Sequence, residues 1–129
     1  MFFIAGEMKN RNRMYFYAPK IHIHGDYTSY IDKNENKHLI IFYAEEKLCF
    51  TVAESTDIVG PKLTKAQGHY SASCKSVFEF FNLPKLEGKT KDQKSQGVNI
   101  PYTIEFIHGR YCACIKTSIL LETINEYKT

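Results

Sequence analysis

The clearest pattern along the chain is a pair of apolar segments separated by a short charged turn. Leu39–Tyr43 is apolar at every position and predicts a central strand. The following segment alternates, and its apolar members share one face: Leu48, Phe50 and Val52. Because Glu45–Lys47 between the two segments is typical of a turn, the sequence predicts a β-hairpin.

Shorter strand-like segments lie on either side of this hairpin. Tyr15–Tyr17 is aromatic throughout, and Lys20–His24 alternates with period two. Tyr27–Asp32 is interpreted as a further short strand. Lys62–Tyr70 also predicts a strand, in which Gly68 marks a bulge or a turn.

The last third of the chain repeats the hairpin pattern. Val98–Ile107 and Tyr111–Lys116 predict two strands joined around His108–Arg110. Strands and hairpins interrupted by few helices favour the α+β class over alternating βαβ units. We therefore predict an α+β fold with a mostly antiparallel sheet built from hairpins and one or two short helices.

Two segments have helical spacing. Ser71 or Ser73 is a candidate cap for a helix that ends at about Leu83, before a proline. Its apolar side chains are expected on one face: Val77, Phe78 and Phe81. A final short helix is predicted after Ser118, with three apolar side chains on one side: Leu120, Ile124 and Tyr127.

The length of 129 residues suits one domain with its own core. Residues 1–14 are interpreted as a flexible leader, because residues 7–13 are polar and basic. Residues 15–129 then form a single α+β domain. Met1, Met8 and Met14 are alternative starts. Lys85–Gly97 is rich in Lys, Gln and Ser, and we expect it to be a mobile basic loop.

Composition and charge exclude few classes of protein function. The chain is 43% apolar and 24% charged, with nine Phe, nine Tyr and no Trp, which is typical of a globular, strand-rich protein. The formal net charge of +3 is mildly basic. Such a charge permits contact with nucleic acid without requiring it.

The cysteines and the N-terminal region bear on the compartment. Four cysteines could form two disulfides in a secreted protein. However, the apolar segment Phe2–Ala5 is too short for a signal-peptide core, and its basic residues follow it. No apolar run is long enough to span a bilayer. We therefore expect a cytoplasmic protein with reduced thiols and no membrane association.

The chain resembles small uncharacterised proteins of bacteroidete-type bacteria and their phages. Four stretches carry the resemblance: Pro19–Ile23, Phe42–Ser55, Lys62–Leu83 and Ile100–Ile115. The resemblance implies a phage or mobile-element origin. Members of that group often have a helix just after the first strand, whereas Asp26–Lys37 has no helical pattern here.

Two pairs of residues could bind a metal ion. His22 and His24 leave the same face of a predicted strand, and Cys112 and Cys114 do so on a later strand. If those strands were neighbours, the four side chains could form a tetrahedral zinc site. The spacing within each pair differs from that of structural zinc sites. The alternative interpretation is that the cysteines are buried core residues and the histidines lie on an exposed strand face. We therefore expect no cofactor.

Motifs for catalysis are missing from the sequence. There is no G-x-S-x-G, no H-E-x-x-H and no phosphate-binding glycine loop. Gly60–Lys65 lacks the second glycine of a P-loop. We expect a protein that is not an enzyme and assign no catalytic residue, with a small metal-dependent enzyme as a second alternative.

Binding is the remaining function class. Our first hypothesis is an intracellular accessory factor that binds a host protein through a strand edge or an aromatic patch. The alternative is binding of nucleic acid or a nucleotide, with tyrosines stacking on bases and cations contacting phosphates. The candidate residues for that alternative are Arg11, Arg13, Tyr15, Tyr17, Lys85, Lys89, Lys91, Arg110 and Tyr111. Unprotected strand edges also predict a homodimer.

Overall fold

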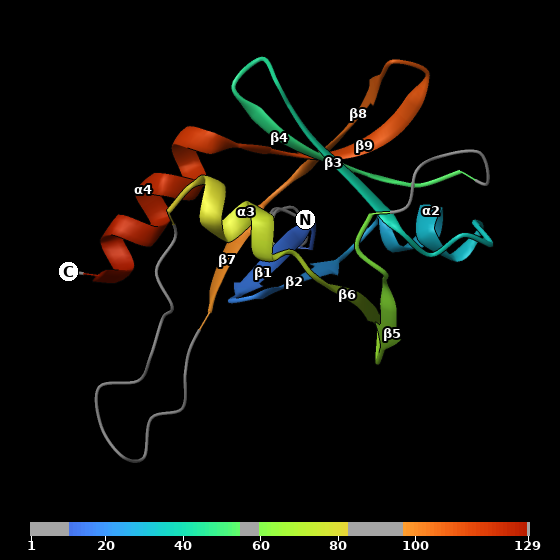
Figure 1. Ribbon diagram of the computed structural model, residues 1–129, viewed down its shortest axis with the longest axis horizontal. Coiled ribbons are helices and arrows are strands. Elements are labelled where there is room, and N and C mark those ends of the chain that lie inside the picture. Colours follow the sequence, from blue (N-terminus) through green and yellow to red (C-terminus); the bar gives the residue numbers. More distant parts are fainter. Residues whose placement is uncertain (1–10, 55–59, 83–96, 129) are drawn as a thin grey trace, which may run out of the picture.

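The computed structural model describes residues 11–54, 60–82 and 97–128. These residues form two antiparallel sheets and three short helices (Figure 1). The five-stranded sheet contains, in spatial order, β5 (Thr64–Ala66), β6 (His69–Ser73), β2 (Lys20–His24), β1 (Arg13–Tyr17) and β7 (Val98–Pro101). The four-stranded sheet contains β3 (Leu39–Ala44), β4 (Lys47–Val52), β9 (Arg110–Lys116) and β8 (Thr103–Ile107). The helices are α2 (Thr28–Asp32), α3 (Lys75–Phe80) and α4 (Thr117–Lys128). The predicted α+β class is confirmed.

The first predicted hairpin lies entirely in the four-stranded sheet. The strand predicted over Val98–Ile107 is divided, because only Thr103–Ile107 forms the second hairpin there, whereas Val98–Pro101 is β7 of the five-stranded sheet. β3 pairs with β4 from Leu39 opposite Val52 to Ala44 opposite Lys47. Their turn residues Glu45 and Glu46 have φ angles of 50° and 62°, as a tight two-residue hairpin turn requires. The second hairpin, β8–β9, turns at His108 and Gly109, which also have positive φ.

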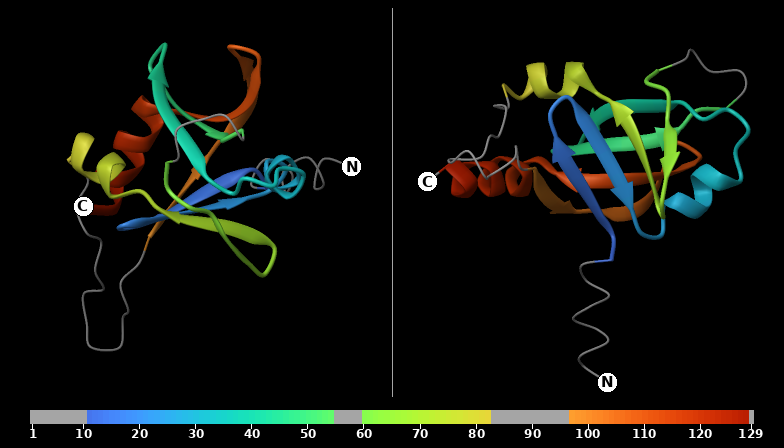
Figure 2. Two further views of the ribbon diagram at one scale, coloured as in Figure 1. Left: turned by 45° about the vertical axis from the view of Figure 1, so that its right-hand side comes forward. Right: turned by 90° about the horizontal axis from the view of Figure 1, so that it is seen from below.

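The two sheets enclose one hydrophobic core (Figure 2). The extended chain Val98–Ile107 passes from one sheet to the other, because β7 pairs with β1 and β8 pairs with β9. The chain changes sheet at Tyr102, which is buried. At the other side, an isolated bridge between His38 and Lys62 connects the start of β3 to the segment before β5.

The prediction of a strand over Tyr27–Asp32 is wrong, because this segment forms α2. Tyr27 and Ile31 are both fully buried, whereas Ser29 between them is exposed. Residues four apart share one face of a helix, but in a strand the residue midway between them would lie on that buried face as well. Thr28 and Ser29 also donate side-chain hydrogen bonds to the carbonyls three residues earlier. A helix therefore does follow the first hairpin, contrary to the expectation for Asp26–Lys37.

Two predicted boundaries also need correction. The segment interpreted as one strand is the hairpin β5–β6, with its turn at Gly68. Ser71 and Ser73 therefore lie in β6 and cap no helix, and α3 begins only after Cys74. β6 extends this far because Tyr70 and Ala72 alternate into the core while the strand pairs with β2.

The first strand and the last helix also differ from their predicted bounds. β1 begins at Arg13, two residues earlier than predicted, because Met14 is fully buried. The last helix starts at Thr117, whose amide and hydroxyl both donate to the Glu46 carbonyl, so Ser118 is not its cap. The predicted leader up to residue 10 and nearly all of the predicted basic loop lie outside the described residues. Among the helices that the structure describes, none is long and apolar enough to cross a membrane.

Candidate nucleic-acid interface

The outer face of the five-stranded sheet gathers aromatic, imidazole and basic side chains. In β1, β2 and β6 the alternate residues are buried against the core, so the remaining positions face outward and are partly or fully exposed. We call these outward side chains of the three central strands the ring face. The ring face comprises Arg13, Tyr15, Tyr17, Lys20, His22, His24, His69, Ser71 and Ser73.

Five aromatic rings form an uninterrupted series across the ring face. Tyr17 and Tyr15 are stacked with their centroids 6.1 Å apart, and Tyr15 lies 5.8 Å from His22. The series continues from His22 to His69 at 5.2 Å and from His69 to His24, stacked at 4.5 Å. The sheet register produces this order, because β1 and β6 pair with opposite edges of β2.

Hydrogen bonds hold the middle of the series in place. The Gly97 amide donates to the Tyr15 hydroxyl over 2.9 Å. A Cβ atom at Gly97 would come within 2.7 Å of the Tyr15 ring and 2.3 Å of the Phe16 carbonyl oxygen. Only glycine therefore allows β7 to approach the tyrosine this closely.

The histidines are linked by a hydrogen-bond relay. His69 Nδ1 lies 3.1 Å from the Gln67 carbonyl oxygen, which can only accept, so this nitrogen carries a proton. In neutral His69, Nε2 is then an acceptor, and His22 Nδ1 donates to it over 3.2 Å. The relay fixes the tautomer and the orientation of both rings.

The charged groups of the ring face are cations. Arg13 donates through Nε to the Asn99 side chain over 3.1 Å, and Lys20 is exposed at the start of β2. The outward positions of β1, β2 and β6 include no acidic residue. Arg11, just before β1, forms an ion pair of 2.9 Å with Asp26 beside this surface.

Two histidines of the ring face, His22 and His24, resist protonation. Burial, followed by the charges of Arg13, His69 and His22, lowers the pKa of His24 from 6.5 to about 4. Burial, followed by His69 and Lys20, also lowers the pKa of His22. At neutral pH both side chains are uncharged, and they offer ring surfaces instead of positive charge.

The stability of the fold is expected to decrease as the pH falls from about 6.5 to about 4. In this window His24 binds a proton in the unfolded chain but stays neutral in the folded one, so acid favours unfolding. Thermal unfolding at successive pH values measures the decrease. His24→Gln should flatten it, because the substituted side chain binds no proton in the unfolded chain. An equal pH dependence in wild type and His24→Gln would contradict this prediction.

The structure brings together only some of the residues predicted to contact nucleic acid. Arg13, Tyr15 and Tyr17 are on the ring face, and Arg11 lies next to it. Lys85, Lys89 and Lys91 lie outside the described residues. Arg110 and Tyr111 are on β9 in the other sheet. There, Arg110 is 3.9 Å from Glu54, and the Tyr111 ring packs against Phe106 at 4.9 Å.

The predicted zinc site is not formed. β2 pairs with β1 and β6, whereas β9 pairs with β4 and β8, so His22 and His24 lie in a different sheet from Cys112 and Cys114. The premise that these strands are neighbours was wrong. Within the described ranges, no group of three or more His, Cys, Asp or Glu residues is placed to hold a metal ion.

The cysteines instead pack as small apolar side chains. All four are free thiols, and Cys49, Cys112 and Cys114 form a buried cluster on the outer face of the four-stranded sheet. The Cys49 and Cys114 sulfur atoms are 3.5 Å apart. Burial raises the pKa of all three thiols and that of Cys74, to about 12 for Cys74, which keeps them protonated at neutral pH.

Four members of the ring face were not identified as candidate site residues from the sequence, namely Lys20, His69, Ser71 and Ser73. The signal for His69 was the alternation around Tyr70 and Ala72, which places it on the outward side of a strand.

Together, the fold and the ring face define an α+β protein of two antiparallel sheets, one of which presents aromatic and basic groups outward. No family model, no curated protein and no solved structure matches this chain.

Proposed function

We propose that this protein binds single-stranded nucleic acid across the ring face of its five-stranded sheet. The observation that carries the proposal is the series of five rings, Tyr17, Tyr15, His22, His69 and His24. Unpaired bases stack on aromatic side chains irrespective of base identity, and each stacked base contributes about 1–3 kcal/mol. A sheet that presents such rings between basic residues is a general solution for binding single strands.

The arrangement favours a single strand over a duplex. In a duplex the faces of the bases are covered by their neighbours, so the side-chain rings have little to stack on. An unpaired strand can place successive bases on the rings while its phosphates contact Arg13 and Lys20. The neutral state of His22 and His24 suits this role, because an uncharged imidazole stacks without first losing a proton.

A protein partner is the main competing function, since tyrosines are also enriched in protein interfaces. Two features of the ring face support nucleic acid instead. Its aromatic rings form a continuous series rather than a single anchor, and its outward charges, Arg13 and Lys20, are both positive. These are the features that a polyanion with unpaired bases needs.

The proposal is tested by titrating a fluorescently labelled oligonucleotide with the protein and measuring anisotropy. We expect single-stranded DNA or RNA to bind more tightly than a duplex of the same sequence. With two cations on the ring face, the plot of log K against log salt concentration should have a slope of about −1.4, from about −0.7 for each phosphate contacted. Equal affinity for duplex and single strand would contradict the proposed mode. No binding at low salt would return the protein-partner hypothesis to first place.

A further inference from the structure

Strand β3 forms the least protected sheet edge in the described part of the chain. The other three edge strands are protected in different ways. β5 is only three residues long and contains Lys65, β7 ends in Pro101, and β8 contains Glu105. β3 has six residues, Leu-Ile-Ile-Phe-Tyr-Ala, with no charge and no proline. An edge of this kind is a template for pairing with another strand.

The backbone direction identifies which groups of β3 point to the open edge. The Leu39 amide donates away from β4, to the Pro61 carbonyl oxygen, over 2.8 Å. Because the direction of the peptide groups alternates along a strand, Ile41 and Tyr43 also point their N–H and C=O groups away from β4. Pro61 occupies the edge beside Leu39, whereas no described strand pairs with the edge beyond it.

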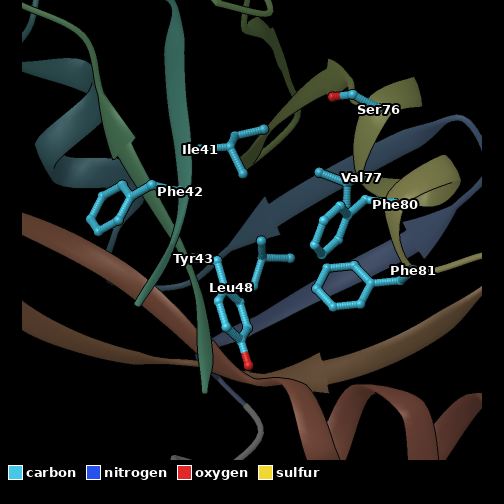
Figure 3. Close-up of a pocket in the computed structure, with 8 residues that line it drawn as sticks. All are labelled: Ile41, Phe42, Tyr43, Leu48, Ser76, Val77, Phe80 and Phe81. Atoms are coloured by element: carbon cyan, nitrogen blue, oxygen red, sulfur yellow. The ribbon is translucent and has the colours of Figure 1, made fainter. Parts of the chain in front are cut away.

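An apolar groove of about 250 Å³ lies beside this open edge, between β3 and α3. Figure 3 shows Ile41 and Tyr43 on one side of the groove and Val77, Phe80 and Phe81 on the other. Phe80 is 73% exposed and Tyr43 is 52% exposed, which is unusual for side chains of this size. The groove and the edge together make one continuous apolar surface.

We propose that this surface binds a second copy of the chain, with the two β3 strands paired antiparallel about a two-fold axis at Phe42. In that register Ile41 of each copy lies opposite Tyr43 of the other, and the two pairs exchange four backbone hydrogen bonds. An axis at Ile41 would require the Leu39 amide, which already donates to Pro61. An axis at Tyr43 would place Ile41 opposite the turn residue Glu45. The register at Phe42 is therefore the one that uses the whole open edge.

The side chains of the second copy fit the same register. Residues that lie opposite each other in a sheet project to the same face, so Tyr43 of the second copy lies beside Ile41, on the side of the groove. There it reaches toward Phe80, whose exposed ring would become covered. A two-fold pairing makes this contact twice.

Charge at the two ends of β3 is also complementary. The turn at one end carries exposed Glu45, and the segment bridged to the other end carries exposed Lys62. Antiparallel pairing brings Glu45 of each copy close to Lys62 of the other. This match would be absent if the strands paired in parallel, and it supports a second copy over an unrelated apolar strand.

Sedimentation equilibrium of the full chain tests the proposal. We expect a species of twice the 15.0 kDa chain mass at micromolar concentration. Tyr43→Lys places a charge on the edge and should raise the dimer dissociation constant by at least about tenfold. Phe106→Lys is the matched control, because Phe106 is 63% exposed on the opposite edge strand of the same sheet, and it should leave the dimer intact.

A charge reversal tests the register itself. Glu45→Lys alone should weaken the dimer, and Glu45→Lys combined with Lys62→Glu should restore it. A wild-type chain that sediments at 15.0 kDa throughout the micromolar range would refute the dimer. Dissociation by Phe106→Lys but not by Tyr43→Lys would place the interface on β8 and refute the β3 edge. The ring face is on the other sheet, so these outcomes are independent of nucleic-acid binding.

Discussion

Replacement of Tyr27 by alanine is expected to lower the free energy of unfolding by about 4–8 kcal/mol. Tyr27 is fully buried and is the largest such side chain in the described chain. Removal of a buried aromatic ring costs about 3–5 kcal/mol, and a buried hydrogen-bonding group left without a partner adds about 1–3 kcal/mol. The total stability of a typical domain is about 5–15 kcal/mol, so this variant should be close to unfolding.

The hydroxyl contribution can be measured separately with Tyr27→Phe. The Tyr27 hydroxyl donates to the Tyr111 carbonyl over 2.8 Å and accepts from the Val52 amide over 3.0 Å. Thr51 also donates to the Tyr111 carbonyl, so the Val52 amide is the group that loses its partner. We expect Tyr27→Phe to cost about 1–3 kcal/mol in urea unfolding followed by circular dichroism. Tyr43→Phe is the control, since a change at an exposed hydroxyl should stay within about 0.5 kcal/mol. Equal stability of Tyr27→Phe and wild type would contradict the role of this hydroxyl.

Loss of the central rings of the ring face is expected to abolish most of the affinity for single strands. Tyr15→Ala and His22→Ala should each weaken binding by about 5–150-fold, which corresponds to about 1–3 kcal/mol for each stacked base. The double variant should lose more than either single one. Lys20→Gln should instead weaken binding of all sequences similarly and reduce the salt slope by about 0.7.

Two controls make this experiment decisive. Tyr15→Phe keeps the ring but removes the acceptor for the Gly97 amide, so it should retain most of the affinity. Phe106→Ala removes an exposed ring from the other sheet and should have no effect on affinity. Circular dichroism at the titration temperature confirms that each variant is folded. If Phe106→Ala weakens binding as much as Tyr15→Ala, the single strand does not bind at the ring face.

Local pattern was sufficient to predict the hairpins β3–β4 and β8–β9 but not the helix α2, which follows the hairpin β1–β2. The hairpin β3–β4 was predictable because both strands and the turn are adjacent in sequence, and each carries its own signal. α2 was missed because it is only five residues long, so its helical spacing rests on the single buried pair Tyr27 and Ile31. Two apolar residues at this spacing also occur in segments without regular secondary structure, and only packing against the core distinguishes such a segment from a helix.

The candidate site was predictable only to the level of single strands. Alternation correctly placed His22 and His24 on a common face of β2. Which strands become neighbours depends on long-range pairing, and the zinc hypothesis failed at this step. β2 pairs with β6, which brings His69 to the histidines, and nothing local to either strand encodes that contact.

The pairing of β1 with β7 has a consequence for synthesis of the chain. Arg13 lies opposite Pro101, so the two partners are separated by 88 residues (101 − 13). At a translation rate of about 5–20 residues per second, β1 waits roughly 4–18 s on the ribosome before β7 exists. During that interval the hairpin β1–β2 has the edge of β1 open. The five-stranded sheet is therefore completed only when β7 has been made, after its other four strands, and until then the edge of β1 is a template for pairing with another strand.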